Sequence, residues 1–174
     1  TGTLFAHEQD DVMPDVVTLA KALGCGIPIG AMLVGEKAAD VLQFGSHGTT
    51  FGGNPLMAAV AHAAVTKLKR PEILQGATEK GEWLKNELAK LNQELDLFVD
   101  IRGRGLMVGA ELKPALAGQA NAISDAARRA GVLVLVAGPN VLRFLPPLTI
   151  TQAEFEQGLL RLRNALKTVL EGLA

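Results

Sequence analysis

Thr18-Leu-Ala-Lys-Ala-Leu-Gly-Cys-Gly-Ile-Pro-Ile-Gly30 is the stretch on which the interpretation of the sequence depends, because its only charged residue is Lys21. An ammonium group surrounded by apolar residues loses hydration, which favours the neutral amine. A neutral lysine amine is a nucleophile, and carbonyl cofactors are its usual targets. The alternative is that Lys21 reaches from the end of an apolar strand to water and has a structural role. This stretch alone favours the structural alternative, and the remaining motifs decide between the two.

The residues around Lys21 predict two short buried strands joined by an irregular turn. Asp15 to Ala20 and Ile29 to Val34 are short, mostly apolar runs, and a short helix is expected over residues 36–43. The glycines and Pro28 between the two runs exclude a long helix. The glycine spacing differs from that of a dinucleotide-binding fingerprint, and Pro28 stands where the helix of that motif would begin. We therefore exclude a nucleotide site of that kind.

A second glycine-rich segment, Gly45-Ser-His-Gly-Thr-Thr-Phe-Gly-Gly-Asn-Pro55, predicts an irregular loop. Backbone N–H groups and hydroxyls in such loops can bind anions, although most loops of this composition are plain connections. Asn54 is a favourable N-cap and Pro55 suits the first helical position, so a helix should begin here. Its expected apolar face consists of Leu56, Val60, Ala64 and Leu68.

The rest of the chain predicts a long helix and then a small α+β unit. A helix should begin at Pro71, because leucines recur at helical spacing from there to Leu95. Strands are expected at residues 97–101, 106–112, 132–136 and 141–145, with helices at 119–130 and from 151 onward. The order is therefore β-β-α-β-β-α, with a domain break near residues 70–76. Gly103-Arg-Gly105 is expected as the first turn, Thr151-Gln-Ala-Glu154 is a capping box, and Arg143 stands in the centre of an apolar strand.

The apolar face expected for the last helix extends to the end of the chain. Its members are Phe155, Leu159, Leu162, Leu166, Val169 and Leu173.

Composition and charge exclude several classes of protein. Apolar residues make up 48% of the 174 residues and the net charge is −1, so neither nucleic acid nor a membrane surface is favoured as a partner. No run approaches the 18 apolar residues of a membrane span. The single cysteine, Cys25, excludes a disulfide framework and a cysteine-based zinc site, and we expect no metal. The chain begins at Thr1 without methionine, and we expect it to be a piece of a longer protein.

Taken together, the four motifs resemble those of the class III pyridoxal-phosphate (PLP) aminotransferases of fold type I. These motifs are Thr18-Leu-Ala-Lys-Ala-Leu-Gly, Gly45 to Pro55, Ile101-Arg-Gly-Arg-Gly-Leu and Val141-Leu-Arg-Phe-Leu-Pro-Pro-Leu. Within that class they look most like acetylornithine and succinylornithine aminotransferases. The resemblance covers essentially the whole chain, and the second motif is the most specific.

The resemblance implies an α/β fold in two parts. Residues 1–72 would be the end of the PLP-binding large domain, with the Schiff-base lysine, and residues 73–174 a small α+β carboxy-terminal domain. Such enzymes are about twice as long. The missing amino-terminal half would carry the phosphate-cup loop, the aromatic residue that stacks on the cofactor ring and the aspartate that pairs with its nitrogen.

The resemblance also implies the role of each candidate site residue. Lys21 would be the catalytic residue, binding PLP covalently and then moving the proton as general acid and base. Thr50 would bind the cofactor phosphate of the neighbouring subunit in a homodimer, and Thr49 would touch substrate. Arg143 would hold the substrate α-carboxylate with its planar fork of donors.

The implied reaction is a ping-pong transfer of the terminal amino group of N2-acetylornithine, or a similar ω-amino acid, to 2-oxoglutarate in the cytoplasm. Other members of the class, acting on succinylornithine, ornithine or 4-aminobutyrate, or an aminomutase, remain alternatives. A different alternative is that the isolated chain is an inactive structural fragment, because half of the cofactor pocket would be missing.

Overall fold

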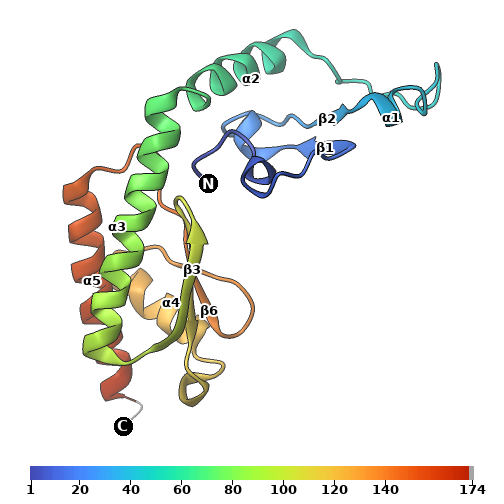
Figure 1. Ribbon diagram of the computed structural model, residues 1–174. Coiled ribbons are helices and arrows are strands. Elements are labelled where there is room, and N and C mark those ends of the chain that lie inside the picture. The colour runs from blue at the N-terminus through green and yellow to red at the C-terminus, as the bar shows by residue number, and fades with distance from the viewer. Residues whose placement is uncertain (173–174) are drawn as a thin grey trace. The chain divides into compact units, whose positions relative to one another are not determined.

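The structure is a computed structural model that describes residues 1–172. The chain divides into two compact units, which are described separately (Figure 1). The first unit is Thr3–Leu74, and the second contains Thr1–Gly2 together with the chain from Gln75 onward. Both units mix helices and strands, as expected for an α/β protein. Leu173 of the expected last apolar face lies outside the described residues.

The first unit is built on one antiparallel hairpin. Its elements in chain order are η1 (Ala6–Asp10), β1 (Val16–Leu19), η2 (Lys21–Leu23), β2 (Ala31–Val34), α1 (Glu36–Ala39) and α2 (Pro55–Leu68). β1 pairs with β2 in the register Val16 to Val34 and Leu19 to Ala31. Both expected strands and the expected short helix are therefore present, although the strands begin later and α1 ends four residues earlier than expected.

The prediction that these two strands are buried is wrong. Val16 and Leu33 are 46% and 48% exposed, and no residue of either strand is buried. A two-stranded sheet has no neighbouring strands, and the rest of this unit covers its residues only in part. The apolar sequence of the strands therefore lies on the surface of the unit.

The start of α2 agrees with the sequence. The Asn54 side chain accepts hydrogen bonds from the N–H groups of Leu56 and Met57 at 3.0 and 3.4 Å, and Pro55 occupies the first turn. The expected apolar face is only partly buried, since Leu56 is 65% exposed while Ala64 is buried. The long glycine-rich loop before Asn54 contains neither helix nor strand, as predicted.

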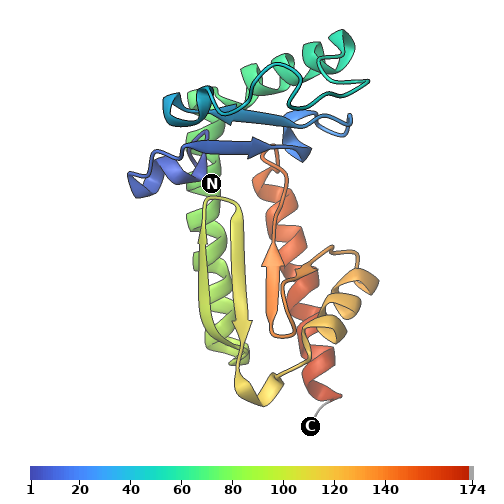
Figure 2. The ribbon, with the colours of Figure 1, turned by 90° about the vertical axis from the view of Figure 1, so that its right-hand side faces the viewer.

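The second unit has the predicted β-β-α-β-β-α order after the long helix. Its elements are α3 (Pro71–Leu95, starting at the end of the first unit), β3 (Phe98–Arg104), β4 (Met107–Leu112), η3 (Pro114–Leu116), α4 (Ala120–Arg129), β5 (Leu135–Val136), β6 (Val141–Phe144) and α5 (Gln152–Glu171). The strands form an antiparallel sheet in the order β3-β4-β6-β5. Figures 1 and 2 show α3 and α5 along the same face of this sheet.

Two details of this unit differ from the sequence prediction. β3 continues through Gly103 and Arg104, so the tight turn is formed by Gly105 and Leu106 instead. The apolar run 132–136 forms a strand only at its last two residues, because α4 ends at Arg129 and the chain must first return to the sheet edge. The capping box at Thr151 and Glu154 is present as predicted.

The core of the second unit lies between the helices and one face of the sheet. Its fully buried large side chains are Leu88, Leu97, Val108, Ile123, Leu142, Leu162 and Leu166. Successive strand residues point to opposite faces, so burial of Leu142 and Phe144 places Arg143 on the face away from the helices. Among the described residues, no helix is long and apolar enough to cross a membrane.

The end of α3 is tied to β3 by one half-buried side chain, Asn92. Its amide nitrogen donates to the Phe98 carbonyl at 2.9 Å, and its oxygen accepts from the N–H groups of Leu97 and Phe98 at 2.8 and 2.7 Å. Three bonds therefore fix the reversal between α3 and the sheet, where Asp96 adopts a left-handed φ of 53°.

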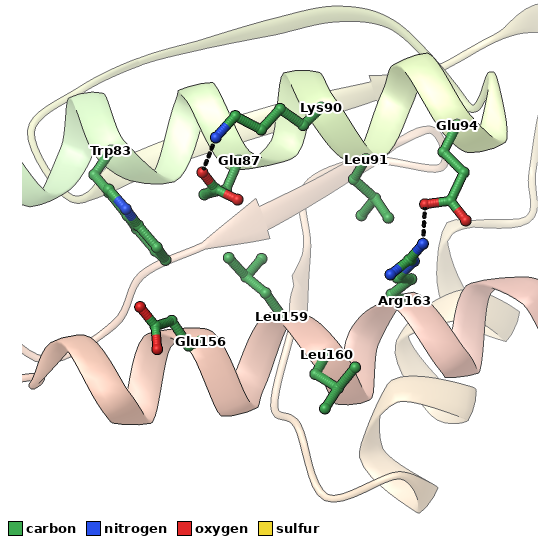
Figure 3. Close-up of a pocket in the computed structure, with 9 residues that line it drawn as sticks. All are labelled: Trp83, Glu87, Lys90, Leu91, Glu94, Glu156, Leu159, Leu160 and Arg163. Carbon is green, nitrogen blue, oxygen red and sulfur yellow. Dashed lines mark hydrogen bonds and ion pairs between the residues drawn. The ribbon is translucent and has the colours of Figure 1, made fainter.

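A groove of about 300 Å³ runs between α3 and α5, with Trp83 and Leu159 among its apolar walls (Figure 3). At one end Glu94 accepts from Arg163 at 2.6 Å and from Lys167 at 2.8 Å. These hydrogen bonds and the two positive charges lower the pKa of Glu94 from 4.5 to about 2. These two ion pairs thus join α3 to α5 by charge as well as by packing.

Replacing Asn92 tests its role in the reversal. Asn92→Ala removes three hydrogen bonds and leaves half-buried partners unsatisfied, so it should lower the free energy of unfolding by about 2–4 kcal/mol. Asn92→Asp keeps the acceptor for two N–H groups and should lose only about 1–2 kcal/mol. Urea unfolding measures both, and an alanine variant as stable as the wild type would contradict this role.

Glu94→Gln should change how the free energy of unfolding depends on pH. Because the folded-state pKa of Glu94 lies below its usual value, its carboxylate adds stability that is complete above about pH 4.5 and is lost as the pH falls through about 2. The variant should therefore have a lower urea midpoint than the wild type near pH 6, and the difference should disappear near pH 2. Glu87→Gln, which removes only the exposed pair with Lys90 within one helix, is the matched control. A constant difference from pH 6 to pH 2 would contradict the assignment.

Candidate functional site

Lys21 stands immediately after β1, at the first residue of η2. Its φ of 51° lies in the left-handed region, which is uncommon for a residue other than glycine. The Lys21 side chain is exposed, so the expected desolvation by apolar neighbours is not found within the described residues. What distinguishes Lys21 is instead its backbone, since a residue held in a sparsely populated conformation is a candidate for a functional constraint.

The turn that follows Lys21 depends on glycine. A Cβ atom at Gly24 would lie 2.2 Å from the Ile27 carbonyl oxygen and 2.7 Å from the Ile29 side chain, so no other residue fits without moving the backbone. Cys25 and Gly26 also have positive φ values, of 49° and 108°. The glycine-rich sequence therefore serves to close a tight turn directly behind the lysine, and Cys25 is a free, exposed thiol.

Thr49 and Thr50 lie in the exposed loop between α1 and α2. Within residues 1–172, neither hydroxyl makes a hydrogen bond to the protein, so both are available to a ligand. The loop is tightly turned, because a Cβ atom at Gly52 would lie 2.0 Å from the methyl carbon of Thr49. It leads into the N-terminus of α2, and α2 contacts η2, which contains Lys21. The structure therefore brings the lysine and threonine segments into the same unit.

Arg143 occupies the centre of β6 in the second unit and is half-buried. Its Nε is buried and has no hydrogen-bond partner among residues 1–172. A buried donor without an acceptor costs free energy, so native proteins rarely contain one unless it has a ligand-binding or catalytic role. Its cross-strand neighbours are Gly109 and Leu135, and neither side chain can accept a hydrogen bond. A carboxylate is the acceptor that best fits a guanidinium group.

The structure thus groups Lys21, Thr49 and Thr50 in one unit and places Arg143 in the other. The groove of Figure 3 contains none of these four residues. The profile of the family "Aminotransferase class-III" matches residues 1–166.

The chain belongs to the class-III aminotransferases. It is 58% identical over 166 residues to an acetylornithine aminotransferase from Xanthomonas campestris, covering 95% of this chain and 41% of that protein. It is 46% identical over 171 residues to a succinylornithine transaminase from Yersinia pseudotuberculosis, covering 98% of this chain and 41% of that protein. The chain therefore spans about two fifths of the length of the curated relatives it matches.

The fold of this class-III chain also matches solved structures. The crystal structure of N-acetylornithine aminotransferase from Stenotrophomonas maltophilia is 51% identical, with a TM-score of 0.90, covering 99% of this chain and 44% of that one. This confirms the expected α/β fold of a PLP-dependent aminotransferase. Class-III aminotransferases use pyridoxal phosphate. The first unit fits such a group in its residue types, because it offers the Lys21 amine and the Thr50 hydroxyl.

The sequence analysis missed one feature of the second unit. Arg102 donates from the same nitrogen to Asp100 at 2.7 Å and to Glu111 at 2.6 Å, on the face of the sheet that carries Arg143. The signal was the spacing of two residues between Asp100 and Arg102, and between Gly109 and Glu111. Only the register between the strands shows that these residues are neighbours.

Arg143→Met tests whether the arginine is retained for binding rather than for folding. Because its buried Nε has no partner, methionine should leave the free energy of unfolding within about 1 kcal/mol of the wild type, or raise it. The control Leu142→Ala removes a fully buried neighbour on the same strand and should cost about 2–5 kcal/mol. Urea unfolding compares the two, and a loss at Arg143 as large as that at Leu142 would assign Arg143 a structural role.

Proposed function

We propose that the whole protein is a PLP-dependent transaminase that moves the terminal amino group of N2-acetylornithine to 2-oxoglutarate by a ping-pong mechanism. The observation that carries this proposal is the 58% identity to an acetylornithine aminotransferase over 95% of the chain, with a lysine, two threonines and an arginine at the expected motif positions. Residues 1–72 would be the end of the large PLP-binding domain, and residues 73–174 the small carboxy-terminal domain.

Lys21 would perform the chemistry that the protein itself contributes at the reacting carbon. Its amine would hold the cofactor, and the same amine would accept a proton from the substrate carbon and return it. The bound cofactor supplies the electron sink for the charge that develops when the substrate loses that proton. The left-handed backbone at Lys21 and the glycine turn behind it would hold the amine in place.

Arg143 and the threonine loop would orient the reactants. Arg143 would donate parallel hydrogen bonds to the α-carboxylate of the substrate, and a half-buried position strengthens such bonds. Thr50 would donate its hydroxyl hydrogen to the phosphate of a cofactor in the neighbouring subunit, so a homodimer is part of the proposal. Thr49 would contact substrate. The enzyme would act in the cytoplasm.

A succinylornithine transaminase is the second candidate, favoured by 46% identity to the Yersinia protein. Both activities need the same lysine and the same arginine, and they differ in the group carried on the α-nitrogen of the substrate. Rates with N2-acetylornithine, N2-succinylornithine, ornithine and 4-aminobutyrate on the whole protein distinguish them. A preference for acetylornithine is expected.

As an isolated chain, residues 1–174 should be inactive. Large apolar side chains of the first unit are exposed, and among them Phe44 and Phe51 are 109% and 81% exposed. Apolar surface of this kind indicates contacts that the whole protein would cover. Light scattering should detect association of the isolated chain, and a soluble monomer would contradict this expectation.

Lys21→Ala in the whole protein should reduce transamination to background, because the substitution removes the nucleophile and the proton carrier together. Lys37→Ala is the matched control, since Lys37 is an exposed lysine of the same unit paired only with Asp15 at 3.2 Å. Borohydride reduction followed by peptide mapping should place the cofactor on Lys21 in the wild type and in the control. Appreciable turnover by Lys21→Ala, or a label on another lysine, would overturn the proposal.

A further inference from the structure

Four residues form one row across the outer face of the sheet in the second unit. Arg102 of β3 lies opposite Gly109 of β4, Gly109 lies opposite Arg143 of β6, and Arg143 lies opposite Leu135 of β5. Residues directly opposite one another on paired strands project to the same face. Two arginines therefore flank a glycine that has no side chain, and a Cβ atom at Gly109 would lie 3.3 Å from the Val141 side chain on the same face.

Glu111 belongs to the same face, two residues beyond Gly109 on the middle strand. It pairs with Asp100 on one side and with Val141 on the other, which makes it a diagonal neighbour of both Arg102 and Arg143. Diagonal neighbours on a sheet lie about 7–8 Å apart, within reach of long side chains. The Glu111 carboxylate can therefore approach either arginine.

In the structure, the carboxylates of Asp100 and Glu111 bind Arg102 and not Arg143. The Arg102 Nη1 binds Asp100 and Glu111 at 2.7 and 2.6 Å, whereas Arg143 has no ion pair within residues 1–172 and its Nε is unpaired. We propose that Arg102 is a positioning residue that holds Glu111 away from Arg143, which keeps Arg143 free to bind a substrate carboxylate. This inference rests on the proposed function of Arg143.

Loss of Arg102 would convert Glu111 into an internal competitor. A carboxylate tethered next to its binding site has an effective concentration in the millimolar range, which is comparable to substrate concentrations at which enzymes are half-saturated. The Glu111 side chain is 40% exposed, so solvent weakens the pair that it could form with Arg143. The expected effect on carboxylate affinity is therefore roughly threefold to tenfold.

A simpler role for the cluster is to join β3 to β4. In that case loss of Arg102 would lower the stability of the sheet, and removing Glu111 as well would lower it further or leave it unchanged. If Arg102 instead restrains Glu111, removing the glutamate must restore the carboxylate affinity that loss of the arginine lowers. Rescue by a second substitution therefore separates the two roles.

The experiment compares five forms of the whole enzyme loaded with cofactor: wild type, Arg102→Met, Glu111→Gln, the double variant Arg102→Met/Glu111→Gln, and Arg143→Met. Calorimetry measures the Kd of glutarate, an unreactive dicarboxylate, and steady-state kinetics measures KM and kcat for 2-oxoglutarate. Arg102→Met should weaken glutarate binding and raise KM roughly threefold to tenfold with little change in kcat. Glu111→Gln should bind at least as well as the wild type, and the double variant should return to wild-type affinity.

The outcomes separate this inference from the proposed function. If Arg143→Met binds glutarate as the wild type does, the role of Arg143 itself is wrong. If Arg143→Met weakens binding but Arg102→Met does not, or if the double variant stays weak, Arg102 has no positioning role and the inference is overturned. Should the methionine variant fail to fold, Arg102→Gln with and without Glu111→Gln replaces it.

Discussion

The alternation of side chains along β6 is the constraint on which the second unit depends. Leu142 and Phe144 are buried against the helices, and their burial fixes Arg143 on the opposite face of the same strand. The core therefore positions the arginine without touching its charged group. What remains unsatisfied is the Nε of Arg143, which is buried but has no acceptor. A protein that retains such a group gives up stability, and the proposed binding of a substrate carboxylate would explain why Arg143 is retained.

Lys21 is positioned in a different way. Its side chain is exposed and its neighbours do not bury it, so its location follows from the backbone. Between the two strands of the hairpin the chain forms η2 and then a tight turn. In this segment Lys21 and Cys25 both adopt left-handed φ values, and Gly24 has no room for a side chain. The lysine thus depends on turn geometry, and the arginine depends on sheet packing.

Local patterns predicted much of this fold. Asn54, Pro55 and the capping box at Thr151 marked helix starts because caps are short-range interactions, and the leucine spacing identified α3. The burial of β1 and β2 was predicted wrongly, because an apolar run shows only that a strand can be buried and not what covers it. The Arg102–Glu111 pair was missed because it depends on register between strands. Lys21 and Arg143 are proposed as site residues through the motifs of a family, because the stretch around the lysine alone favoured a structural role for it.

The account is tested most directly by a crystal structure of the whole protein with glutarate bound. A carboxylate of the ligand should accept hydrogen bonds from the Nε and a terminal nitrogen of Arg143, while Glu111 stays on Arg102. A structure in which glutarate binds elsewhere and the Arg143 Nε remains without an acceptor would contradict the central claim that this unpaired nitrogen marks the substrate site.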